Sequence, residues 1–127
     1  MKLRTTHNSI RIRIRKSELA LLEQKQVVEE SIRFPNGVLF KFILKIDTTV
    51  SELTASLVNN DLVLSMPQQS AKNWINTNEV GIESYINLSS EEQLHLLIEK
   101  DFPCLDRPNE NKSDTFWELA PETVENC

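Results

Sequence analysis

The stretch Ser9-Ile10-Arg11-Ile12-Arg13-Ile14-Arg15 decides how the first part of the chain folds, because isoleucine and arginine alternate in it without a break. Successive side chains of a β-strand point to opposite faces of the sheet. The pattern therefore predicts a strand whose isoleucines face a core, while its arginines form a row of charges roughly 6.6 to 6.8 Å apart. Such a row needs nearby anions, which can come from the same chain or from a ligand.

Length and composition indicate one ordinary folded domain. The 127 residues are 39% hydrophobic and 26% charged, which is typical of domains that fold without metal or disulfide. No apolar run approaches the roughly 18 residues of a membrane span, and no apolar stretch of a secretory signal follows the charged start. Two glycines are too few for a glycine-rich phosphate loop. Because Cys104 and Cys127 are too few for a disulfide framework, we expect reduced thiols in a cytoplasmic protein without a cofactor.

Charge is distributed unevenly along the chain. Residues 1–45 carry ten basic and four acidic residues, residues 46–102 carry two and nine, and residues 103–127 carry two and six. A fold that brings the basic first third against the acidic middle neutralises itself. This argues against a broad basic surface for nucleic acid.

Two hairpins are predicted in the middle of the chain. The apolar residues on either side of Pro35-Asn36-Gly37 align only across a three-residue turn, which places Ile32 opposite Phe40. A second hairpin turns at Asn59-Asn60, because asparagine tolerates the positive φ of tight turns.

The remaining pattern completes an α+β domain. Helices are expected at residues 18–26 and 67–75, and further strands at residues 80–88 and 94–102. The order of elements favours a largely antiparallel, curved or barrel-like sheet of about six to seven strands with two short helices. Residues 1–102 form this single domain, and residues 103–127 form an acidic, proline-containing tail that we expect to be mobile. No internal repeat is evident.

Several strings of the sequence occur together in one known family. They are Asn8-Ser9-Ile10-Arg11-Ile12-Arg13 with Lys16-Ser17-Glu18, Glu79-Val80-Gly81, Ile98-Glu99-Lys100-Asp101-Phe102 with Cys104-Leu105, and Asp114 with Phe116. Over about residues 1–117 the chain resembles this family of small uncharacterised bacterial proteins, a domain of unknown function. The resemblance implies a complete bacterial, cytoplasmic protein, and it implies no activity, cofactor or substrate.

The arginine row is the first candidate site. Neighbouring arginines about 6.8 Å apart repel by about 2.4 kcal/mol at an effective dielectric of 20. In the structural interpretation, Glu99 and Asp101, or Glu29, offset this repulsion from a neighbouring strand. In the functional interpretation, cations converge on a phosphorylated or carboxylated ligand, because guanidinium groups bind such oxyanions in a bidentate manner. The candidate binding residues are Arg11, Arg13, Arg15, Arg33, Lys41 and Lys100, with Glu99, Asp101 and Cys104 in support.

Other candidate sites carry weaker signals. Cys104 and His95 lack the second ligand pair that zinc sites usually show, so we predict no metal site. No Gly-x-Ser-x-Gly elbow accompanies His7 or His95, which argues against catalysis. The aromatic string Thr115-Phe116-Trp117-Glu118-Leu119 can dock on a partner or fold back on the chain's own basic strand, and we favour the second.

These observations predict a non-enzymatic domain that binds an anionic ligand or an acidic protein segment. The alternative is a small hydrolase or transferase that acts on a phosphorylated substrate in a charged, β-lined pocket. An enzyme brings Arg11, Arg13, Lys100 and at least one carboxylate into one concave pocket, whereas a binding scaffold pairs them across a flat exposed sheet. We expect neither nucleic acid nor a membrane as a partner, and exposed strand edges allow a homodimer.

Overall fold

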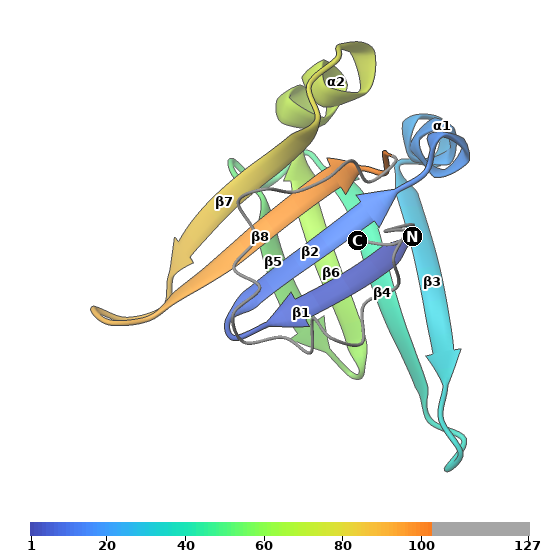
Figure 1. The fold of residues 1–127 in the computed structure, drawn as a ribbon, viewed down its shortest axis with the longest axis vertical. Helices are drawn as coiled ribbons and strands as arrows, with labels where there is room; N and C mark the ends of the chain where they lie inside the picture. Colours follow the sequence, from blue (N-terminus) through green and yellow to red (C-terminus); the bar gives the residue numbers. More distant parts are fainter. Residues whose placement is uncertain (103–127) are drawn as a thin grey trace, which may run out of the picture.

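The computed structural model describes residues 1–102, which form ten elements (Figure 1). In chain order these are β1 (Lys2–Thr6), β2 (Ser9–Ile14), α1 (Lys16–Lys25), β3 (Val27–Arg33), β4 (Leu39–Asp47), β5 (Thr54–Val58), β6 (Asp61–Pro67), α2 (Gln68–Asn76), β7 (Gly81–Asn87) and β8 (Gln93–Lys100). The predicted tail, residues 103–127, lies outside the described residues.

The strands form two separate sheets, so the prediction of one largely antiparallel, curved or barrel-like sheet of six to seven strands was wrong. Sheet A has the order β1-β2-β8-β7, and sheet B has the order β3-β4-β6-β5. Both sheets are mixed, because their central pairs, β2 with β8 and β4 with β6, run parallel while the outer strands pair antiparallel. Parallel pairs between distant strands have no turn signal in the sequence, which is why the prediction missed them.

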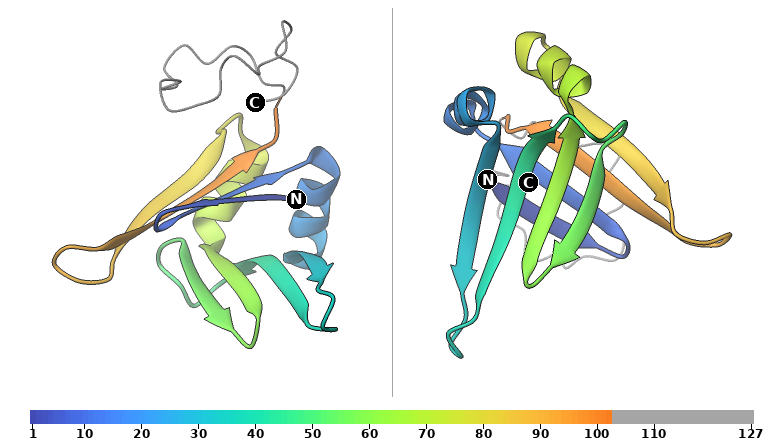
Figure 2. Two further views of the ribbon diagram at one scale, coloured as in Figure 1. Left: turned by 60° about the horizontal axis from the view of Figure 1, so that its bottom comes forward. Right: turned by 180° about the vertical axis from the view of Figure 1, so that it is seen from behind.

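The two sheets cross face to face, and both helices lie at the same end of the molecule (Figures 1 and 2). One hydrophobic core collects side chains from both sheets and both helices. Ile12 and Ile14 are 0% and 1% exposed, so the inward direction of the isoleucines is confirmed. Within residues 1–102, neither helix is long and apolar enough to cross a membrane.

Both predicted hairpins have the predicted register. Ile32 pairs with Phe40, and Gly37 adopts a φ of 84°, as a three-residue turn with a left-handed third position requires. Leu57 pairs with Leu62 in the second hairpin. Local turn residues and apolar alignment were sufficient for these pairings.

The topology is duplicated, although the sequence shows no evident repeat. The order strand-strand-helix-strand-strand occurs twice, in β1 to β4 with α1 and in β5 to β8 with α2. Each half gives one hairpin to each sheet, so neither sheet is complete without both halves. Equivalent positions are buried in the two halves: Ile12 and Leu64, Ile14 and Met66, Leu22 and Trp74, Phe42 and Leu96, and Leu44 and Ile98. The repeat is therefore one of apolar positions rather than of residue identities.

Candidate functional site

Cross-strand pairing gathers four cations on the outer face of sheet A. Lys2 of β1 lies opposite Arg13 of β2, and Arg4 lies opposite Arg11. Directly opposed residues have Cβ atoms about 4.5 to 5.5 Å apart, so the four charges form two adjacent rows. We call these four residues, Lys2, Arg4, Arg11 and Arg13, the basic face.

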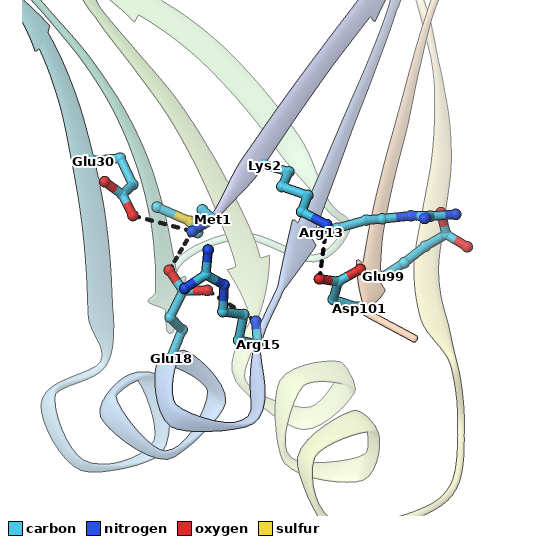
Figure 3. Close-up of polar contacts among 8 residues, drawn as sticks. All are labelled: Met1, Lys2, Arg13, Arg15, Glu18, Glu30, Glu99 and Asp101. Atoms are coloured by element: carbon cyan, nitrogen blue, oxygen red, sulfur yellow. Dashed lines mark hydrogen bonds and ion pairs between the residues drawn. The ribbon is translucent and has the colours of Figure 1, made fainter. Parts of the chain in front are cut away.

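Two carboxylates, one at the end of β8 and one directly after it, lie against the basic face. Glu99 pairs with Arg13 in the parallel register, and its Oε1 is 3.2 Å from Arg11 Nε and 3.6 Å from Arg13 Nε. Asp101 Oδ2 is 3.1 Å from Lys2 Nζ (Figure 3). The structural interpretation is therefore confirmed for Glu99, which pairs with Arg11 and Arg13, whereas Asp101 pairs with Lys2 and not with the predicted arginine row. Glu29, the other acidic residue considered as a partner of the arginine row, belongs to β3 of sheet B.

The arginines of β2 are partly shielded from water. Arg13 and Glu99 side chains are 12% and 14% exposed, and that of Arg11 is 30% exposed. Within residues 1–102, Arg13 Nε and Glu99 Oε1 are buried without a hydrogen bond. The Arg13 guanidinium carbon lies 5.1 Å from the Phe102 ring centroid, a cation–π contact at the start of the C-terminal segment.

Gly81 allows β7 to lie close to the β8 backbone beside Glu99. A Cβ atom at residue 81 would lie 2.6 Å from the Ile98 carbonyl oxygen and 3.3 Å from Glu99 Cγ. Gly81 is the cross-strand partner of Glu99, so a side chain there would collide with the β8 backbone at Ile98 and would also crowd the Glu99 side chain.

The start of β1 is held in place by the helix that follows β2. The Met1 ammonium pairs with the carboxylates of Glu18 in α1 and Glu30 in β3 (Figure 3). Glu18 Oε1 also accepts a hydrogen bond of 2.9 Å from the Arg15 backbone N–H, as in a capping box. Burial raises the pKa of Glu18, but the hydrogen bonds from the ammonium and the Arg15 amide outweigh this effect and lower the pKa below 4.5.

The six cations of the predicted binding site lie in separate places. Arg11 and Arg13 remain together, whereas Arg15 precedes α1 as its N-cap. Arg33 and Lys41 belong to the β3–β4 hairpin of sheet B. Lys100 Nζ donates a hydrogen bond of 2.7 Å to the Thr77 carbonyl oxygen, beside the Trp74 ring. Cys104 lies outside the described residues. Lys2 and Arg4, which complete the basic face, were missed because β1 has little apolar alternation.

A second polar cluster lies on the same outer face. The parallel register places Ser9 beside His95. Ser9 Oγ is 3.3 Å from His95 Nδ1, and His95 Nε2 is 2.7 Å from Glu83 Oε2. The Tyr85 ring stacks on His95 with centroids 4.5 Å apart. Sequence reasoning set His95 aside, because only the pairing of β2 with β8 brings Ser9 to it.

This cluster borders a surface pocket of about 370 Å³. The pocket is lined by His7, Asn8, Ser9, Tyr85, Glu91, Glu92, Gln93 and His95. Within residues 1–102, no three His, Cys, Asp or Glu side chains are grouped so that they could hold a metal ion.

Comparison with known proteins adds a family but no activity. No curated protein and no solved structure gives a significant match to the chain. A family model does match, over residues 1–119. The matched range includes the basic face, both of its carboxylates and the Ser9 cluster. The chain therefore belongs to DUF7009, a family of unknown function.

Proposed function

We propose that this protein is a non-enzymatic binding domain whose basic face takes an acidic protein segment. The observation that carries the proposal is the placement of four cations against two carboxylates on an open sheet face. Arg4 has no ion-pair partner within residues 1–102, so the face keeps a positive charge that an acidic partner can neutralise.

The spacing of the cations favours an extended segment over a small anion. Arg11 and Arg13 lie two positions apart on one strand, which is about 6.6 to 6.8 Å. Alternate side chains of an extended acidic segment have the same spacing, so its carboxylates can follow the row. A small phosphorylated ligand needs cations that converge, and the six predicted cations are divided among both sheets and the ends of the helices.

The test is an amide NMR titration of the full chain at low salt with two probes, an octamer of glutamate and inorganic pyrophosphate. We expect the octamer to shift the amides of β1 and β2. Arg4→Glu should weaken its binding by about 5-fold or more, because the exchange reverses a charge in the face. Lys41→Glu makes the same exchange on sheet B and should leave binding unchanged.

Two results would contradict the proposal. One is octamer binding that Arg4→Glu and Lys41→Glu weaken equally, since this indicates attraction by net charge alone. The other is pyrophosphate binding to the basic face more tightly than the octamer, which indicates a small anion as the ligand. A salt titration separates a contact ion pair from long-range attraction.

We also propose that the protein acts in the bacterial cytoplasm. The support is the small number of cysteines and the resemblance of the sequence to small bacterial proteins.

The Ser9 cluster favours a second candidate function, a hydrolase with Ser9 as nucleophile. His95 Nδ1 can accept the hydroxyl proton while Nε2–H donates to the Glu83 carboxylate, an order of groups that activates serine in hydrolases. Glu91 and Glu92 line the pocket and would repel a phosphate group. An uncharged ester therefore fits the pocket better than the phosphorylated substrate that the sequence suggested for an enzyme.

Hydrolysis of p-nitrophenyl acetate tests this second candidate. Wild-type protein should release nitrophenol faster than Ser9→Ala, and Ser56→Ala, an exposed change in β5, should match wild type. Equal rates for wild type and Ser9→Ala would exclude Ser9 as the nucleophile.

A further inference from the structure

The chain leaves β8 across the basic face. The Asp101 backbone N–H donates a hydrogen bond of 2.8 Å to the Ile14 carbonyl oxygen at the end of β2. Asp101 then reaches Lys2 of β1, and the Phe102 ring lies over Arg13. The first two residues after β8 thus place one carboxylate and one aromatic ring on the cations of the face.

The sequence beyond Phe102 continues the same chemistry. Residues 103–127 carry six acidic and two basic residues. Within them, Asp114, Phe116 and Glu118 alternate with Thr115, Trp117 and Leu119. In an extended conformation the first three share one side at a spacing of about 6.8 Å. This acid–aromatic–acid row matches the spacing of the arginines. Guanidinium groups are attracted both by carboxylates and by the faces of aromatic rings.

The family match and the chain length agree with this arrangement. The family model continues past β8 and ends at residue 119, the last residue of the segment 114–119. The 11 residues from 103 to 113 can span up to about 36 Å when extended, so the row can reach any part of the face.

From these observations we infer that residues 114–119 dock on the basic face of their own chain. The inference rests on the proposed function, because it names the acidic segment that the face binds. The docked segment occupies the face until an external acidic segment displaces it. The apparent association constant of an external partner is therefore its intrinsic constant multiplied by the fraction of chains in which the face is vacant.

Paramagnetic relaxation in the full chain tests the inference. Ser113→Cys in a Cys104→Ser/Cys127→Ser background carries one nitroxide label next to the proposed segment. We expect the label to broaden amides of β1 and β2 and to leave those of β3 and β4 sharp. Asp114→Lys/Glu118→Lys should abolish the broadening, whereas Glu122→Lys/Glu125→Lys, the same charge change further along, should preserve it.

Other patterns of broadening would overturn the inference. Broadening of the β3–β4 hairpin would place the segment on the exposed apolar side chains of Ile32 and Phe34, each 48% exposed. Uniformly weak broadening would show that the segment does not dock. Broadening that appears only between a spin-labelled chain and a separate isotope-labelled chain would place it on a second copy.

The glutamate octamer separates failure of this inference from failure of the proposed function. If both hold, Asp114→Lys/Glu118→Lys binds the octamer at least about 3-fold more tightly than Glu122→Lys/Glu125→Lys, which adds the same charge, because only the first variant leaves the face vacant. If only the proposed function holds, these two variants bind the octamer equally. If the proposed function fails, neither protein binds the octamer through β1 and β2.

Discussion

Glu99 is the residue on which the basic face depends. Its carboxylate lies between two guanidinium groups at 3.2 and 3.6 Å and is largely shielded from water. Removing one member of a buried charged cluster costs more than the cluster contributes as a whole, because the remaining charges keep their desolvation cost.

Glu99→Gln should therefore destabilise the protein although it preserves shape. We expect a loss of about 2 kcal/mol in the free energy of unfolding, since Arg11 and Arg13 then face each other without their shared anion. Urea unfolding measures the loss. Glu91→Gln, an exposed change, should stay within about 0.5 kcal/mol of wild type, and a similarly small effect of Glu99→Gln would show that the arginines need no internal counterion.

At the scale of elements, α1 holds the edge strand that supplies half of the basic face. Glu18 joins the helix N-terminus to the Met1 ammonium at the start of β1. Its pKa is lowered in the folded state, despite the opposing effect of burial. A group with a lowered folded pKa contributes stability above its unfolded pKa and loses the contribution as pH falls through the folded pKa.

Glu18→Gln should accordingly show a pH-dependent effect. Near pH 7 we expect the free energy of unfolding to fall by about 1 kcal/mol, because the carboxylate accepts hydrogen bonds from the ammonium and a helix N-terminal amide. The difference in the free energy of unfolding between this variant and wild type should shrink as pH falls below 4.5, the ordinary carboxyl pKa. Unfolding curves between pH 3 and 7 measure it. A difference that stays constant over this range would mean that the charge of Glu18 is not involved.

The elements also show what sequence could and could not predict. The β3–β4 register follows from the turn at Gly37 and from the alignment of Ile32 with Phe40, which are both local. The inward isoleucines and the pairing of the arginines with Glu99 follow from alternation and charge. The parallel register of β2 with β8 has no local signal, so Ser9 beside His95 could not be predicted.

At the scale of the molecule, duplication explains why the sheets are mixed. Each half contributes a hairpin to both sheets, and the two hairpins of each sheet meet along a parallel central pair. Of the central strands of the two sheets, only β2 carries arginines on the outer face. Arg11 and Arg13 of β2 correspond to Val63 and Ser65 of β6, so the arginine row of sheet A has no counterpart on the equivalent strand of sheet B.

The most direct measurement is NMR of the arginine Nε–H groups in the full chain as the glutamate octamer is added. We predict that Arg11 and Arg13 signals shift together and saturate, while the Arg33 signal on sheet B stays in place. Equal shifts of Arg33 and Arg11, or no shift of either β2 arginine, would contradict the claim that the outer face of sheet A binds acidic segments.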